Sequence, residues 1–152
     1  MENKSINHFK KKFMFLSNFY KSKFKDKEGN IWPSVEHYFQ AMKTNDYKER
    51  EEIRVSPNPG SAKKKGRNVK LRDDWDQIKE DVMYEGLYYK FTQNENLRRK
   101  LIETGDLFLK EGNYWHDNIW GDCYCQKCEK IKGKNILGHL LMTLRTNLKE
   151  HI

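Results

Sequence analysis

The sequence contains little cysteine and little proline, and it lacks any long apolar run. Three cysteines and three prolines occur among 152 residues, which excludes a disulfide scaffold and a collagen-like chain. No stretch approaches the roughly 18 apolar residues that a membrane-spanning helix needs. The N-terminal segment is basic, but it has neither the apolar core nor the cleavage site of a secretory signal. We therefore expect a cytoplasmic protein with no membrane partner, and the sequence leaves protein partners open.

Aromatic and basic residues are plentiful instead. Aromatic residues make up 13% of a chain whose hydrophobic residues reach only 36%, so aromatic rings have to supply much of the core. The formal charge is +8, and residues 1–70 carry 17 basic and 8 acidic side chains, so the positive excess lies in the first half. A focused basic field attracts the phosphates of a nucleotide or a nucleic acid. The alternative is a solvated basic face that aids solubility.

The hydrophobic pattern predicts an α+β fold, a single mostly helical domain with a few short strands. Residues 1–12 are predicted to be a flexible basic segment, and residues 13–150 to form the domain. The SPNPG segment at 56–60 is expected to break the chain, and the basic stretch 62–70 stays unassigned. Strands are predicted at 13–20, twice within 23–32, and at 106–110; helices are predicted at about 35–42, 74–91, 94–104 and 135–150.

The helix after Ser34 combines an apolar face with a polar one. Its apolar residues recur with helical spacing and predict a buried stripe. Glu36, Gln40 and Lys43 are spaced i, i+4 and i+7, so a carboxylate, an amide and an amine point the same way. His37 lies off both faces and is expected to be exposed.

Two lysines interrupt the apolar stripes of the helix at 74–91. Lys79 and Lys90 fall between the stripes, where an unpaired lysine is unusual because lysine is rarely fully buried. Either each stem packs while its ammonium group reaches water, or one of them is a functional lysine in a pocket.

All three cysteines lie in one short segment, Cys123, Cys125 and Cys128. This C-x-C-x2-C spacing offers three thiolates, and zinc requires four ligands, of which His116 or His139 could be the fourth. The alternative is a loop of reduced cysteines without metal, because a second cysteine pair from a distant segment is absent. Zinc is therefore one possible cofactor, and no other is indicated.

The motifs of several enzyme classes are missing. The chain has no G-x-S-x-G, no phosphate-binding Walker loop and no G-x-G-x-x-G. Aromatic rings with interspersed polar residues remain, and such rings can stack on bases. A neighbouring carboxylate can help to cleave a glycosidic bond, and a desolvated lysine can form a Schiff base with an opened sugar. Each tryptophan taken singly is better explained by core packing.

An ordered set of segments resembles the NADAR, or YbiA-like, family over residues 13–146. The most specific block is EHYFQAMK at 36–43. The set comprises FLSNFY at 15–20, WPSVEHYFQAMK at 32–43, Trp75 with Lys79, Val82 and Met83, KFTQN at 90–94, Thr104-Gly105, Trp120-Gly121, and NILG at 135–138 with Leu141, Met142 and Arg145.

The resemblance implies an α+β domain that hydrolyses the bond between a base nitrogen and ribose C1′. Members are linked to removal of ADP-ribose from guanine in nucleic acid, and to a phosphorylated ribosylamino-pyrimidine of riboflavin synthesis. The net charge favours the first substrate slightly. A third hypothesis is a basic module that binds nucleotide or nucleic acid without catalysis.

The same resemblance suggests roles for individual residues. Glu36 and Trp75 correspond to residues that members require, and Lys43 is favoured over Lys79 as the amine of a Schiff base. Other residues are predicted to bind substrate: Asn18, Phe19, Trp32, Gln40, Lys79, Trp120, Gly121, Asp122, Asn135 and Arg145.

Overall fold

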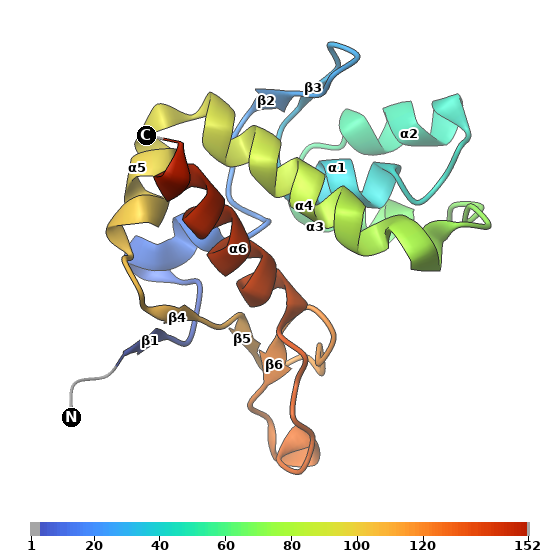
Figure 1. Cartoon of the computed structure of the whole chain (residues 1–152). Coiled ribbons are helices and arrows are strands. Elements are labelled where there is room, and N and C mark those ends of the chain that lie inside the picture. The colour runs from blue at the N-terminus through green and yellow to red at the C-terminus, as the bar shows by residue number, and fades with distance from the viewer. Residues whose placement is uncertain (1–3, 152) are drawn as a thin grey trace. The chain divides into compact units, whose positions relative to one another are not determined.

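The computed structural model describes residues 4–151, which form two units (Figure 1). One unit is continuous and spans residues 18–95, whereas the other combines the segment up to Ser17 with the segment from Asn96 onward. The fold is α+β and mostly helical, as predicted. None of the helices within residues 4–151 has the length and apolar character that crossing a membrane requires.

The continuous unit is built around one short, fully buried helix. All residues of α1 (Val35–Ala41) are buried, and α1 packs against α2 (Tyr47–Arg54), α3 (Pro59–Gly66) and α4 (Trp75–Gln93). The antiparallel strands β2 (Phe24–Lys25) and β3 (Ile31–Trp32) close one side. A helix with no exposed face presents its polar side chains to other protein groups instead of water.

Aromatic rings fill the core of this unit. Tyr38 meets the ring of Trp32 edge-on at 5.3 Å and that of Phe24 at 5.9 Å between ring centroids. The Trp32 indole N–H donates to Asp26 Oδ2 at 2.9 Å, which satisfies the polar group that the ring buries. Trp32, predicted to bind substrate, is therefore a buried core residue.

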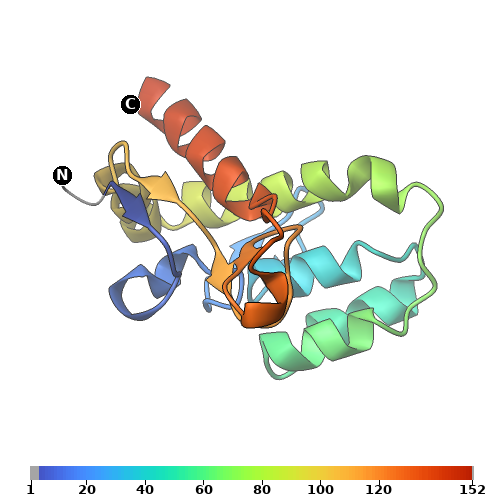
Figure 2. The same ribbon diagram turned by 90° about the horizontal axis from the view of Figure 1, so that it is seen from below.

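The second unit joins the two ends of the chain through parallel strand pairs. Strand β1 (Ser5–Ile6) pairs with β4 (Phe108–Leu109), and β5 (Gly112–Asn113) pairs with β6 (Asp122–Cys123). The other elements of this unit are η1 (Lys11–Leu16), α5 (Glu95–Glu103), η2 (Gln126–Cys128) and α6 (Ile136–Glu150). Figure 2 shows β1 beside β4 from below, and α6 contacts β4.

Several expectations for local structure were wrong. Residues 13–20 do not form a strand, because 11–16 wind into the 3-10 helix η1. Helices α2 and α3 were not predicted; α3 begins at Pro59, where Asn58 caps the helix by accepting from Ser61 N at 2.8 Å. The flexibility of residues 1–12 stays a prediction: residues 1–3 lie outside the described chain, and in the rest of the segment β1 is paired and Ile6 and Phe9 are buried.

Candidate functional site

The start of α1 is fixed by a hydrogen-bonded histidine. Ser34 caps the helix and lies 2.7 Å from His37 Nδ1, while His37 Nε2 donates to the Ser56 carbonyl at 3.0 Å. Burial lowers the pKa of His37, against the opposing effect of the Ser56 bond. The expectation that His37 is exposed was wrong, since His37 is a buried, neutral bridge between α1 and the chain after α2.

Glu36 and Gln40 lie one turn apart on α1, and both side chains are buried. Gln40 Nε2 donates to Glu36 Oε1 at 2.7 Å. The opposite end of this amide, Gln40 Oε1, is buried and has no hydrogen-bond partner among residues 4–151. A buried carboxylate beside an unused buried acceptor is costly to retain without a purpose, because buried polar groups are nearly always hydrogen-bonded.

Asn18 adds a second open acceptor. Its backbone carbonyl accepts from Glu36 N at 3.1 Å, and its side-chain amide donates weakly to Met83 Sδ at 3.3 Å. Asn18 Oδ1 is buried without a partner in the described chain. The structure thus brings Asn18 next to Glu36, as a shared site requires.

Helix α3 passes so close to Gln40 that a side chain at Gly66 would displace the Gln40 amide. A Cβ at Gly66 would overlap Gln40 Oε1 and lie 2.9 Å from Gln40 Cδ. Gly66 therefore permits the close approach of α3 that confines the amide of Gln40. No sequence motif signalled this approach.

Lys43 follows the C-terminal end of α1 and is half-buried. Burial lowers the pKa of its ammonium group; the charge of Glu36 raises that pKa, and the charges of Lys63 and Arg67 lower it. The Lys43 ammonium stands 5.7 Å from the centre of the Phe39 ring. The predicted grouping of a carboxylate, an amide and an amine is therefore present, and its carboxylate and amide are buried.

Trp75 lies near this group. Its ring packs at 5.1 Å against Phe39, the residue whose ring also faces Lys43. Phe19 is exposed, and the ammonium of Lys63 lies 5.9 Å from the centre of its ring. Lys79 instead pairs with exposed Asp76 at 3.3 Å on the outside of α4.

A different lysine of α4 occupies the interior. Lys90 is completely buried, and burial lowers its pKa to about 7. Its ammonium lies 5.7 Å from the centre of the Tyr20 ring and 5.0 Å from that of Phe91. The sequence signal, a lysine between two apolar stripes, was present for both lysines, but only Lys90 is fully buried.

The predicted residues of the other unit interact with groups of that same unit. Asn135 Oδ1 accepts from Glu111 N at 2.9 Å, and Asn135 Nδ2 donates to the Leu109 carbonyl at 2.9 Å. Buried Arg145 donates to Thr104 Oγ1 at 2.9 Å. The remaining residues lie in the same unit: Gly121 accepts from Asn135 N, Asp122 pairs with Lys110 at 3.3 Å and accepts from Gly133 N, and Trp120 is half-buried.

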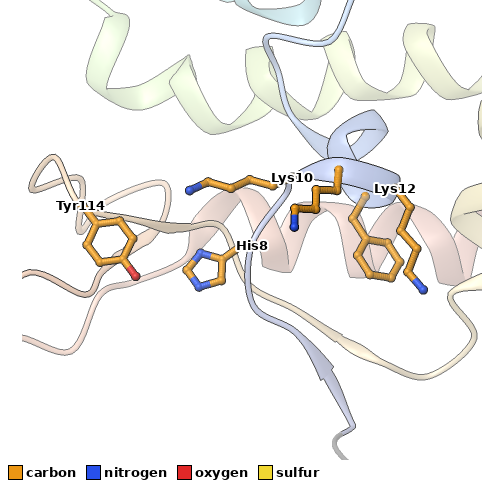
Figure 3. A pocket seen from close by; sticks show the side chains of 6 residues that line it. His8, Lys10, Lys12 and Tyr114 are labelled. Atoms are coloured by element: carbon orange, nitrogen blue, oxygen red, sulfur yellow. The ribbon is translucent and has the colours of Figure 1, made fainter.

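The basic N-terminal run lines an open cavity of about 530 Å³ in this unit (Figure 3). The rings of His8 and Tyr114 stack with 6.2 Å between centroids and 6° between planes. The ammonium of Lys10 stands 5.8 Å from the centre of the Tyr114 ring, and Lys11 and Lys12 complete the basic side. Cationic groups beside stacked rings suit a polyanion or a base.

Comparison with known proteins identifies the family. The profile of the NADAR domain matches residues 6–149. The chain belongs to the NADAR family. A relative from Shigella flexneri serotype 5b (strain 8401), called N-glycosidase YbiA, is 46% identical over 123 residues, covering 80% of this NADAR chain and 73% of the relative. By this relationship the NADAR chain is a hydrolase acting on N-glycosyl bonds.

Two further similarities extend this assignment. The NMR structure of Escherichia coli YbiA matches with a TM-score of 0.86 and 39% identity, covering 99% of this NADAR chain and 88% of that protein. A riboflavin biosynthesis protein of Vibrio vulnificus is 37% identical over 139 residues, which are 90% of this chain and 36% of the relative. A similar domain thus occurs in a longer protein that is named for riboflavin biosynthesis.

Proposed function

We propose that this NADAR domain hydrolyses the N-glycosyl bond between ADP-ribose and guanine in nucleic acid. The observation that carries the proposal is the buried pair of Glu36 and Gln40, with Lys43 in electrostatic contact with Glu36. A buried carboxylate stabilises the positive charge that develops at C1′ as the glycosyl bond lengthens. The open acceptors Asn18 Oδ1 and Gln40 Oε1 are available to ribose hydroxyl groups.

Lys43 is the amine in this proposal. Its lowered pKa increases the share of neutral amine at neutral pH. Opening of the ribose ring first breaks the C1′–O4′ bond, so that C1′ becomes an imine of the guanine nitrogen and the proton of that nitrogen passes to O4′. The Lys43 amine adds to C1′, its two protons pass in turn to the guanine nitrogen, and the bond from C1′ to guanine breaks. An imine then joins Lys43 to C1′. Water then adds to C1′, and the bond to Lys43 breaks to release ADP-ribose and the amine. One water molecule is consumed and one glycosyl bond is broken.

Two substrates separate the proposed reaction from its main rival. Purified protein is incubated with DNA carrying ADP-ribosylated guanine and, separately, with the phosphorylated ribosylamino-pyrimidine. Release of ADP-ribose from the DNA supports the proposal, and turnover of the pyrimidine alone contradicts it. A relative named for riboflavin biosynthesis supports the rival reaction. Ligand binding without turnover of either substrate would favour the non-catalytic module.

Reduction with borohydride during turnover identifies the lysine. We expect a covalent ADP-ribose adduct that maps to Lys43 by mass spectrometry and disappears in Lys43→Ala. Lys48→Ala, which changes an exposed lysine on α2, should keep the adduct. An adduct on Lys90 would reject the role of Lys43 while leaving the glycosidase intact.

The basic cavity provides the test for a polymeric substrate. A plot of the logarithm of the DNA association constant against the logarithm of the salt concentration has a negative slope. That slope should become shallower by about 0.9 for each lysine that no longer neutralises a phosphate. Lys10→Gln with Lys12→Gln should therefore raise KM for ADP-ribosylated DNA at physiological salt and leave KM for an ADP-ribosylated guanine nucleoside unchanged. Equal changes for both substrates would contradict a role in binding the polymer.

A further inference from the structure

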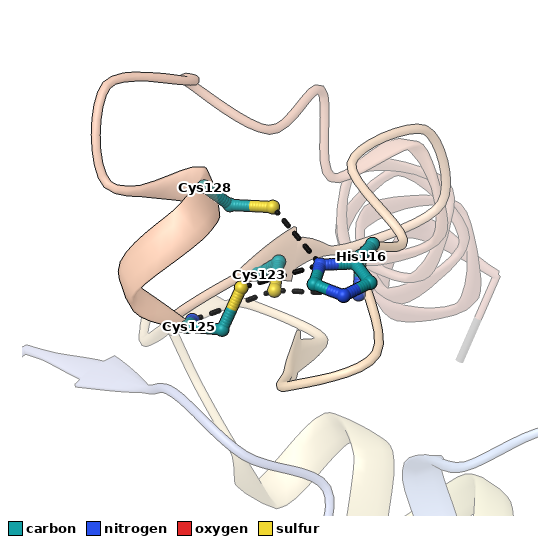
Figure 4. Close-up of side chains that lie close together, drawn as sticks. All are labelled: His116, Cys123, Cys125 and Cys128. Carbon is teal, nitrogen blue, oxygen red and sulfur yellow. Dashed lines mark hydrogen bonds between the residues drawn. The ribbon is translucent and has the colours of Figure 1, made fainter.

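We propose that His116, Cys123, Cys125 and Cys128 form a structural zinc site. The ligand atoms of the four residues all lie within 4.8 Å of one another. His116 Nδ1 is 3.2 Å from Cys125 Sγ and 3.4 Å from Cys128 Sγ. A tetrahedral zinc site with ordinary Zn–N and Zn–S bonds places such atoms about 3.6 Å apart. Figure 4 shows the four side chains pointing toward one another, His116 from its loop and the three cysteines from the segment 123–128.

The loop that carries His116 is shaped to present this ring. His116 adopts a left-handed conformation with φ of 70°, which is uncommon for a residue other than glycine. Asn113 Oδ1 accepts from the backbone N–H groups of Trp115 and Asp117, on either side of the histidine. Asp117 Oδ1 in turn accepts from Trp120 N at 2.9 Å. The histidine is thus held by side-chain bonds to the backbone on both flanks, independently of the cysteines.

Backbone donors also surround the sulfur of Cys123. The N–H groups of His116 and Cys125 point to Cys123 Sγ at 3.3 and 3.4 Å. Such donors stabilise a thiolate that binds metal and fix its orientation. Cys123 lies on β6 and Cys128 ends η2, so regular elements position two of the three sulfurs.

The ligand set indicates both the metal and its role. Three thiolates and one imidazole match a Cys3His zinc site, and soft sulfur ligands disfavour magnesium and calcium. Four protein ligands leave no open position for water or substrate, so the site stabilises the fold and takes no part in the glycosidase reaction. On binding, the metal replaces the thiol protons and accepts the lone pair of neutral His116.

The segment between β5 and α6 has little regular structure of its own, so a bound metal would stabilise it. Between β5 and α6 the chain forms only β6 and the three-residue helix η2, and several large apolar side chains are exposed there. A segment with so little buried apolar surface gains stability from a metal, because the binding free energy becomes folding free energy. The large exposed side chains of this segment are Tyr114, Trp115, Ile119, Tyr124 and Ile131.

Metal analysis of the purified full chain tests the site. Protein made without a metal-binding tag and kept reduced should contain about one zinc per chain. After replacement by Co²⁺, tetrahedral ligand-field bands and a thiolate-to-cobalt charge-transfer band should appear. X-ray absorption at the zinc edge should fit three sulfur ligands and one nitrogen ligand. Removal of zinc by a strong chelator should lower the melting temperature, and added zinc should restore it.

Two matched variants distinguish this site from surface binding. His116→Asn should reduce zinc affinity at least tenfold, whereas His139→Asn, which changes an exposed histidine outside the cluster, should leave it unchanged. Cys128→Ser should abolish the charge-transfer pattern of three thiolates. Equal zinc content in the wild type and in both cluster variants would overturn the proposal. If the variants do not fold, a competition titration of the wild type decides, and affinity no better than that of free thiols overturns it.

Discussion

The buried amide side chains of the two units make different use of their hydrogen-bonding groups. In the unit of residues 18–95, Asn18 and Gln40 are buried with one acceptor each left open beside Glu36. In the other unit, Asn113 and Asn135 are equally buried, but each uses both ends of its amide to hold the backbone. Burial of a polar group therefore does not mark a site. Acceptor capacity that the fold leaves unused is the better guide.

The comparison predicts its largest effect on catalysis at Glu36. Glu36→Gln keeps the shape of the side chain but removes the charge that we propose to stabilise C1′, so kcat should fall about 10²- to 10³-fold. The melting temperature should stay close to that of the wild type. Steady-state kinetics on the substrate turned over by the wild type measure the loss. The matched control is Glu80→Gln on the exposed side of α4, and equal activity in the two variants would refute the role of Glu36.

The two buried asparagines should respond in opposite ways. Asn135→Ala leaves Glu111 N and the Leu109 carbonyl without their side-chain partner, which should cost about 2–4 kcal/mol of unfolding free energy. Asn18→Ala breaks only a weak bond to sulfur, so its stability should change by less than about 1 kcal/mol while kcat/KM falls. Urea unfolding combined with kinetics on both variants measures the contrast. Similar stability losses would remove the distinction between the two units.

Lys90 tests whether a buried charge lowers the free energy of unfolding in the unit of residues 18–95. Because burial lowers its pKa to about 7, the unfolded chain binds more protons than the folded chain between pH 7 and the ordinary lysine pKa. Stability contributed through Lys90 therefore rises with pH across this window. Lys90→Met should flatten the slope by up to about 1.4 kcal/mol per pH unit. Urea unfolding between pH 7 and 9 measures it, with exposed Lys48→Met as control; parallel curves for wild type and Lys90→Met would contradict the burial.

The smallest expected effect comes from adding a single methyl group to α3. Gly66→Ala should displace the amide of Gln40 and weaken its bond to Glu36, lowering kcat/KM about tenfold, the value of one hydrogen bond to a charged group. Gly60→Ala on the same helix is the control, because its Cβ would lie 3.4 Å from Asn58 Oδ1 in ordinary contact. Kinetics that do not distinguish the two variants would show that Gln40 is not confined by Gly66.

Sequence periodicity predicted the elements with strong patterns. The helices at α1, α4 and α6 follow from apolar spacing, and α5 follows from the stop signal at Thr104-Gly105. The hairpin of β2 and β3 follows from the turn at 27–30, whose Gly29 has φ of 87°. Helices α2 and α3 were not predicted, because their charged and small residues carry little apolar pattern. Packing against α1 stabilises them as helices. The segment at 13–20 is apolar enough for either a strand or a helix. Tertiary packing stabilises a 3-10 helix over residues 11–16.

The site was predictable in its composition but not in its environment. Spacing placed Glu36, Gln40 and Lys43 on one face of a helix. Burial of that face depends on α3 and on Asn18, which approach from elsewhere in the chain. The same limit applied to His37, whose partner Ser56 is 19 residues away. Long-range interactions of this kind have no signature in a single sequence.

The division of the chain also has a consequence for the order of events during synthesis. Residues 18–95 form a continuous unit, so its internal packing can form as soon as that stretch has left the ribosome. Strand β1 emerges first, but its partner β4 follows about a hundred residues later. Strand β1 therefore cannot pair until β4 has been synthesised. The continuous unit can fold before that, while the two ends of the chain are still apart. A stalled ribosome from which residues up to 100 have emerged should thus hold α1 already protected from protease.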